Sequence, residues 1–153
     1  MKRILLKLSG EVLGKSAFDR EKVEFFAHEI AKLEGIEIAV VLGGGNIWRG
    51  RDATEFGFLP ADSDAVGMAA TVLNAAVLRN VLTKNGKSTR VFSPFSVDRL
   101  SEKYSPDRAK SSLESGEIIF CAGGTGSPFF TTDSAAVLRA LELQCDAVFQ
   151  GTK

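Results

Sequence analysis

Short apolar runs alternate with longer helical segments along this chain, and this alternation restricts the fold more than any other feature of the sequence. Strands are predicted at 3–8, 36–42, 89–92, 117–121 and 147–150. Helices are predicted at about 19–34, 62–84, 106–115 and 132–145. The apolar runs are continuous, which is typical of strands buried on both faces. Strands joined by helices in this order predict a mostly parallel sheet that is covered by helices.

The length and composition fit a single globular domain. The chain has 153 residues, of which 44% are hydrophobic and 25% are charged, as is ordinary for a folded protein. A chain of this size buries about two thirds of its surface, so it needs no disulfide or metal to fold. We therefore expect one compact α/β unit over residues 1–153, without an internal repeat or a low-complexity linker.

The charge balance and the scarcity of cysteine exclude several classes of function. Nineteen basic and nineteen acidic residues cancel, which argues against a nucleic-acid coat or a membrane-surface binder. Cys121 and Cys145 cannot form a disulfide framework, and with His28 as the only histidine there is no Cys/His metal spacing. The amino-terminal apolar run is too short for a signal peptide or a membrane span. A cytoplasmic location is therefore expected.

Three glycine-containing loops each follow a predicted strand, at 7–10, 43–46 and 123–126. Because the carboxyl ends of parallel strands meet at one edge of the sheet, we expect these loops to lie together. Glycines there allow backbone N–H groups to approach a phosphate without a side chain in the way. A tight turn explains one such loop equally well, but three loops close to Lys7 and Arg49 favour an anionic ligand.

Two common phosphate-binding motifs are not completed. The segment 10–16 has three residues between its glycines where the P-loop motif requires four, and the next helix is predicted to begin several residues later. Neither 43–48 nor 124–129 completes the G-x-G-x-x-G pattern of dinucleotide-binding folds. The sequence therefore predicts neither a P-loop enzyme nor a dinucleotide-binding domain.

The stretch 125–133 combines hydroxyl donors, a rigid proline, two aromatic residues and the start of a helix. Its threonines and the helix N-terminus suit a phosphate, and the backbone around Pro128 suits a flat base. Asp133 suits a cation or the ammonium group of Lys7. The structural alternative places Phe129 and Phe130 in the core and makes Thr132 an ordinary N-cap.

Four ordered motifs resemble those of the bacterial-type UMP kinases of the amino acid kinase family. They are KLSGE at 7–11, GGGNIWRG at 43–50, DAVGM at 64–68 continuing to Asn74, and GTGSPFFTTD at 124–133. Together they cover essentially the whole chain. The resemblance implies a three-layer α/β/α sandwich, usually assembled as a homohexamer, that transfers the γ-phosphate of ATP to UMP with the help of Mg²⁺.

The resemblance also implies three catalytic side chains. Lys7 would neutralise charge on the transferred group, Arg49 would bridge the two phosphates, and Asp133 would organise the lysine or the magnesium. Such a reaction relies on positioning and cationic stabilisation, so it needs no catalytic histidine or cysteine. Metal ligands are not assigned. The implied ATP-binding residues are Lys7, Leu8, Ser9, Gly10, Gly45, Arg49 and Thr152.

The acceptor site implied by the resemblance lies on the other side of the phosphates. Asp64 would accept hydrogen bonds from the UMP ribose. The structural alternative makes it the cap of the long helix, and the two roles are compatible. The segment 125–132 would wrap the base and the phosphate. The implied UMP-binding residues are Gly44, Asp64, Thr125, Gly126, Ser127, Pro128, Phe129, Phe130, Thr131 and Thr132.

Three features depart from the family pattern. Ser127 stands where the family usually has an asparagine that contacts the base, and Gln150 stands near the ATP site where lysine is common. The segment 14–18 is shorter than the loop that binds GTP in some members, so activation by GTP is not expected. None of these departures removes a group assigned to the transfer step.

Two other functions stay open from the sequence. A relative acting on acetylglutamate, aspartate or carbamate would share Lys7 and the loop at 43–45, but it would not need the stretch 125–133. A nucleotide-binding fragment without catalysis is the second. Chains of this family continue past the position of Thr152 and Lys153 into elements that close over the adenine. We therefore expect residues 1–153 to be the UMP- and phosphate-binding portion of a longer kinase.

Overall fold

Parallel strands form one six-stranded sheet at the centre of the computed structural model, which describes residues 2–151. The strands are β1 (Arg3–Leu8), β2 (Glu37–Leu42), β3 (Thr89–Ser93), β4 (Glu102–Lys103), β5 (Ile118–Cys121) and β6 (Ala147–Gly151). They lie in the order β4-β3-β5-β2-β1-β6, and all neighbouring pairs are parallel. The prediction of a mostly parallel sheet is confirmed.

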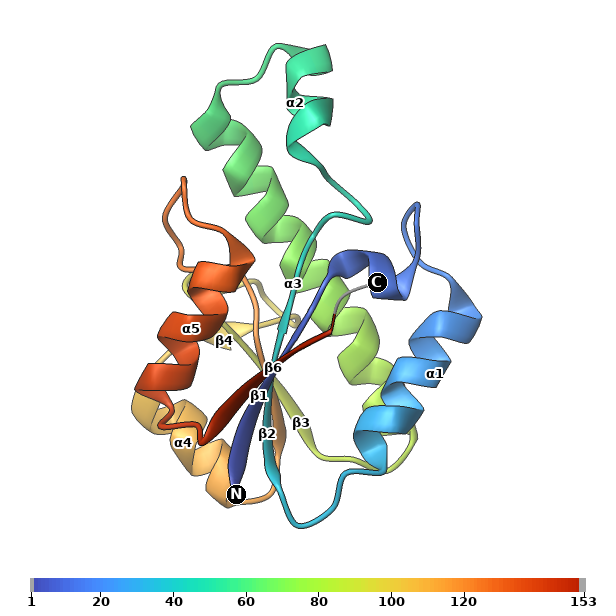
Figure 1. Cartoon of the computed structure of the whole chain (residues 1–153), viewed down its shortest axis with the longest axis vertical. Coiled ribbons are helices and arrows are strands. Elements are labelled where there is room, and N and C mark those ends of the chain that lie inside the picture. Colours follow the sequence, from blue (N-terminus) through green and yellow to red (C-terminus); the bar gives the residue numbers. More distant parts are fainter. Residues whose placement is uncertain (1, 152–153) are drawn as a thin grey trace.

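Helices cover both faces of this sheet (Figure 1). They are η1 (Gly10–Leu13), α1 (Arg20–Ala31), α2 (Gly50–Phe56), α3 (Pro60–Lys84), α4 (Pro106–Glu114) and α5 (Thr132–Glu142). In Figure 1, α4 and α5 lie on one side of the sheet and α1 and α3 on the other, while α2 and the start of α3 extend beyond the strands. This is the three-layer α/β/α arrangement that the resemblance implied.

The alternation of side chains along β1 divides the core into two halves. Ile4 and Leu8 pack with residues of α1 and α3, whereas Leu5 packs with residues of α4 and α5. Because successive side chains of a strand point to opposite faces, Lys7 shares the face of Leu5. The last part of β1 therefore directs its lysine toward α5.

Two helices end earlier than predicted because the chain turns sharply after them. The expected helix at 19–34 stops at Ala31, and Gly35 adopts a φ of +69° that redirects the chain into β2. The expected helix at 132–145 stops at Glu142, and Gln144 has a φ of +57°. Residues with positive φ cannot continue a right-handed helix.

The long helix α3 begins two residues before its predicted start. Leu59 is its N-cap and Pro60 its first residue, a position that tolerates proline because the first N–H groups have no partner within the helix. Asp64 therefore lies in the second turn, and the expectation that it caps the helix is wrong. At α5 the cap is Thr131 rather than Thr132, and its hydroxyl accepts from the Ser134 N–H at 3.1 Å.

Three short elements, η1, α2 and β4, are not predicted by the periodicity of the sequence. The helix α2 is fixed by its ends, since the Asp52 carboxylate accepts from the Arg49 N–H at 2.9 Å and Gly57 terminates it with a φ of +69°. The strand β4 has only two residues, paired with Phe92 and Ser93 of β3. Elements this short span at most about two periods of a hydrophobic pattern, too few to stand out in a window of about 11 to 18 residues.

By length and composition alone, α3 would be able to cross a membrane. This is weak evidence, because the core helix of a globular domain has the same character. Here Leu78 and Leu82 of α3 are fully buried in the half of the core that it shares with α1.

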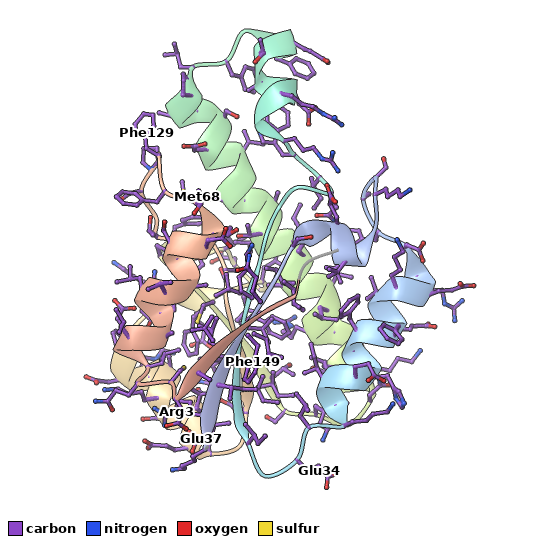
Figure 2. The ribbon with its side chains drawn as sticks, in the orientation of Figure 1. Arg3, Glu34, Glu37, Met68, Phe129 and Phe149 are labelled. Atoms are coloured by element: carbon purple, nitrogen blue, oxygen red, sulfur yellow. The ribbon has the colours of Figure 1, made fainter. Side chains whose placement is uncertain are left out.

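A cluster of charged groups lies at the amino ends of β1 and β2, where Figure 2 labels Arg3 and Glu37. The Arg3 Nε donates to the Glu37 carboxylate at 2.6 Å. Burial opposes the ionisation of Glu37, but the hydrogen bonds from Arg3 and Lys2 hold its pKa below the usual 4.5. The backbone N–H groups of Arg3 and Lys2 likewise lower the pKa of Asp146 below 3.8.

Because these pKa values are lowered in the folded state, the free energy of unfolding depends on pH. A carboxylate whose pKa is lower in the folded state stabilises the protein above its unfolded pKa, and this contribution is lost as the pH falls through the folded value. We expect the free energy of unfolding to decrease between about pH 5 and pH 3, and Glu37→Gln to reduce that decrease. Urea titrations at several pH values measure the free energy of unfolding of the wild type and of Glu37→Gln. Glu55→Gln, on the exposed face of α2, is the control and should keep the wild-type pH dependence. An unchanged acid dependence in Glu37→Gln would contradict this assignment.

Candidate active site

The loops that follow β1 and β2 contact each other at the carboxyl end of the sheet. The Gly43 N–H donates to the Leu8 carbonyl at 2.8 Å. A Cβ atom on Gly10 would lie 2.5 Å from the Asn46 Oδ1 and 2.6 Å from the Gly43 carbonyl oxygen. Glycine is therefore required at position 10 by the close approach of the two loops.

We expect Gly10→Ala to destabilise the fold by about 3 kcal/mol, since the added methyl group would overlap the Asn46 side-chain oxygen and the Gly43 carbonyl of the facing loop. Gly45→Ala is the matched control, because a Cβ atom at Gly45 meets no other atom within 4 Å. It should change the free energy of unfolding by less than about 0.5 kcal/mol. Urea unfolding of both variants measures the difference, and equal shifts would refute the steric explanation.

A buried pair of asparagines fastens the loop at 43–46 to α3. The Asn74 Nδ2 donates to the Gly43 carbonyl and to the Asn46 Oδ1, both at 2.7 Å. The Asn46 Nδ2 donates in return to the Asn74 Oδ1 at 3.0 Å. These bonds hold the glycines of this loop in one conformation at the edge of the sheet.

Lys7 and Asp133 form an ion pair at this edge. The Lys7 Nζ lies 2.5 Å from the Asp133 Oδ1, and the Gln150 Nε2 donates to the same oxygen at 3.4 Å. The pair joins the end of β1 to the first turn of α5. This agrees with the position of Lys7 on the same face of the sheet as Leu5, which packs against α5. The lysine is buried while the Asp133 side chain is 59% exposed. The arrangement thus places one cation beside the N-terminus of a helix.

Arg49 is held by the loop at 43–46 and by η1. Its Nε donates to the Gly45 carbonyl at 2.7 Å, and its NH2 group lies 2.5 Å from the Glu11 Oε1. Both side chains of this pair are about one third exposed. The guanidinium group is therefore fixed next to the glycine loop yet accessible to a ligand.

An open cleft of about 360 Å³ lies next to these cations, between α3 and α5. Six of the predicted acceptor-site residues line it, namely Gly44, Asp64, Ser127, Phe130, Thr131 and Thr132. The remaining lining residues are Trp48, Gly50, Ser63, Gly67, Met68, Thr71 and Gly124. The predicted catalytic residues Lys7, Arg49 and Asp133 do not line the cleft, but Asp133, which pairs with Lys7, directly follows the lining residue Thr132 in α5.

Other predicted residues lie outside the cleft wall. Thr125, Gly126, Pro128 and Phe129 belong to the same loop but do not line it. Leu8 and Ser9 lie at the end of β1 beside Gly43. Thr152 lies outside the described residues.

The loop 123–131, which contributes part of the cleft wall, is hydrogen-bonded to α3. From α3, the Thr71 hydroxyl accepts from the Gly123 N–H at 2.7 Å and the Asp64 Oδ2 accepts from the Phe129 N–H at 2.7 Å. Phe129 has a φ of +71°, which a residue with a side chain adopts only under restraint. Phe129 and Phe130 are 74% and 63% exposed, so the alternative that placed them in the core is wrong. Figure 2 labels Phe129 and Met68 in this region.

Apart from Asp64, the cleft residues contributed by α3 were not predicted, and neither was Trp48 in the loop that follows β2. The Trp48 Nε1 donates to the Ser63 hydroxyl at 3.0 Å, and its ring stacks on Phe56 and Phe58. A weak signal was present, because Ser63 and Thr71 are polar residues that α3 buries, and a buried polar group needs a partner or a ligand.

The chain matches known proteins along its whole length. The model of the amino acid kinase family matches residues 2–153. A uridylate kinase of Anaplasma phagocytophilum (strain HZ) is 46% identical over 156 residues, covering 99% of this chain and 64% of that protein. A uridylate kinase of Rickettsia bellii (strain RML369-C) is 46% identical over 157 residues, covering 99% of this chain and 66% of that protein.

Comparison with solved structures also finds similar UMP kinases. The UMP kinase from Bacillus anthracis has a TM-score of 0.95 at 38% identity, covering 99% of this chain and 65% of that one. The UMP kinase from Ureaplasma parvum has a TM-score of 0.95 at 35% identity, covering 99% of this chain and 66% of that one. This chain thus spans slightly less than two thirds of the length of these relatives.

Proposed function

This chain belongs to the amino acid kinase family, and we propose that its cleft binds UMP as the acceptor of the γ-phosphate of ATP, so that the reaction yields UDP. The observation that carries the proposal is the position of the cleft. It is lined by Asp64 and by Gly124, Ser127 and residues 130–132. The next residue along α5, Asp133, pairs with Lys7. In this proposal, residues 1–153 hold the acceptor and the phosphates.

The transfer needs little covalent chemistry from the protein. A phosphate oxygen of UMP attacks the γ-phosphorus in line, a new P–O bond forms, and the bond to the leaving ADP oxygen breaks. Negative charge spreads over the three equatorial oxygens as this happens. Lys7 and the Arg49 guanidinium group supply the positive charge that stabilises them.

Asp64 and the loop would recognise the nucleoside. In the proposed complex the Asp64 carboxylate accepts from the ribose hydroxyls, and Phe129 N–H shares the same carboxylate. Thr131 and Thr132 lie at the N-terminus of α5, where backbone N–H groups favour a phosphate. The exposed ring of Phe130 on the cleft wall offers an apolar surface to the flat base.

Magnesium would enter with ATP rather than through a dedicated cage of protein ligands. Residues 2–151 contain no cluster of three or more His, Cys, Asp or Glu side chains able to hold a metal. Mg²⁺ commonly binds through substrate phosphates and one or two carboxylates, and Asp133 fits that role. Bound there, the ion would neutralise phosphate charge.

The proposal extends to assembly and location. We place the reaction in the cytoplasm and in pyrimidine nucleotide synthesis, in a homohexamer as the resemblance implies. The free thiols of Cys121 and Cys145 suit a reducing compartment. Val66 and Leu73 on the outer face of α3 are apolar and exposed, as a surface covered by another copy would be.

The test is phosphorylation of UMP, CMP, acetylglutamate, aspartate and carbamate side by side with ATP and Mg²⁺. We expect UMP to be the preferred acceptor. Activity confined to the small acids would refute the proposal, and UMP binding without turnover would assign the chain to nucleotide binding alone. CMP tests Ser127, which replaces an asparagine that the family uses to contact the base.

A further inference from the structure

A buried arginine lies beneath the loop 123–131 without lining the cleft. Arg139 belongs to α5 and is 5% exposed. Its NH2 group donates to the Gly124 carbonyl at 3.3 Å. A guanidinium group stays charged in proteins, so burying it requires compensation by partners.

The compensation comes from two residues, Glu142 and Tyr104, which also contact each other. The NH1 group donates to the Glu142 carboxylate at 2.7 Å, one turn along α5. The Tyr104 ring lies under the guanidinium carbon at 4.0 Å, and its hydroxyl donates to the same carboxylate at 2.9 Å. Burial is the first cause that raises the pKa of Tyr104, so this hydroxyl remains a donor. The arginine is thus locked in one orientation.

The contact to Gly124 falls at the point where the loop leaves the sheet. Gly123 and Gly124 have φ values of +74° and +59°, so the chain reverses sharply there. The far end of the loop is fixed to the same helix by the Thr131 cap. Arg139 and Thr131 therefore tie both ends of the loop to α5, while Thr71 and Asp64 tie it to α3.

We infer that Arg139 is a positioning residue, which acts through the Gly124 carbonyl to hold the loop 123–131 in the conformation that receives the acceptor nucleotide. The inference rests on the proposed function for the identity of that nucleotide. Glu142 and Tyr104 serve the same purpose by holding Arg139. None of the three side chains lines the cleft, so their effect reaches the ligand only through the loop.

The decisive variant is Arg139→Met, which keeps a long apolar side chain and removes both hydrogen bonds. We expect amide hydrogen exchange in 124–130, measured without nucleotide, to become at least about tenfold faster. The dissociation constant for UMP should rise about tenfold, because the unrestrained loop must be ordered on binding. Arg139→Lys should behave similarly, since an ammonium group lacks the fork that reaches two acceptors. Tyr104→Phe, which keeps the ring, should have a smaller effect.

The matched control is Leu143→Val, a fully buried residue at the end of the same helix. It should lower the unfolding midpoint while leaving loop exchange and UMP affinity unchanged. If Arg139→Met leaves loop exchange at the wild-type rate, the inference is overturned whatever happens to binding. If loop exchange responds but the wild-type chain does not bind UMP, the anchoring role stands and the proposed function fails.

Discussion

Replacing Lys7 by methionine should reduce phosphoryl transfer to UMP by about 1000-fold, in line with the loss of a preorganised charge aimed at the transferred group. The ammonium group is buried at the end of β1 and lies 2.5 Å from the Asp133 carboxylate. Methionine is one atom shorter than lysine but keeps an unbranched apolar stem that can pack on the α5 face of the sheet. The Asp133 carboxylate that loses its partner is more than half exposed, so water can solvate it.

The measurement is a coupled assay of ADP formation with calorimetry of UMP on the same preparation. Because the charge acts mainly in the transition state, UMP affinity should stay within about threefold of wild type. Lys15→Met, on the exposed segment between η1 and α1, is the control and should leave turnover unchanged. A Lys7→Met chain that turns over at the wild-type rate would remove Lys7 from the mechanism.

If Arg49 bridges the two phosphates as proposed, Arg49→Ala should reduce turnover by about 100-fold, because it removes the guanidinium group that lies next to the Gly45 carbonyl. Stability should change by less than about 1 kcal/mol, since the ion pair with Glu11 is partly exposed and such pairs contribute little. The start of α2 should persist, because the bond to Asp52 uses the backbone N–H of residue 49.

The effect of Arg49→Ala is measured as turnover alongside thermal unfolding. Arg20→Ala is the matched control, since Arg20 also pairs with a glutamate, Glu24 of α1, but lies on the outer surface. It should leave turnover unchanged. Wild-type turnover in Arg49→Ala would contradict the bridging role, and a loss of folding as large as the loss of activity would make the residue structural.

The parts of the fold that follow from local pattern were predictable. Continuous apolar runs identify five of the six strands of the sheet, and the rule that parallel strands end at one edge brings Lys7, Gly44 and the loop 123–126 together. The missed strand, β4, has two residues and exists because β3 offers it hydrogen bonds. The formation of β4 depends on pairing with β3, and a short stretch of sequence around residues 102–103 carries no information about that pairing.

The parts of the site that depend on side-chain packing were not predictable. The spacing of Trp48, Ser63 and Met68 does not indicate that they share a cleft, because the loop after β2 and the helix α3 are brought together only by tertiary packing. The contact between Arg139 and Gly124 likewise depends on where α5 returns across the sheet. The alternative that buried Phe129 and Phe130 failed because hydrophobicity alone does not distinguish a core residue from one exposed at a binding site.

The central claim is that the cleft between α3 and α5 is an acceptor site for UMP. Calorimetric titration of the wild-type chain with UMP, and separately with acetylglutamate, tests it most directly. We predict saturable binding of one UMP per chain, weakened by Asp64→Asn, and no binding of acetylglutamate. Saturable binding of acetylglutamate with no heat from UMP would contradict the account.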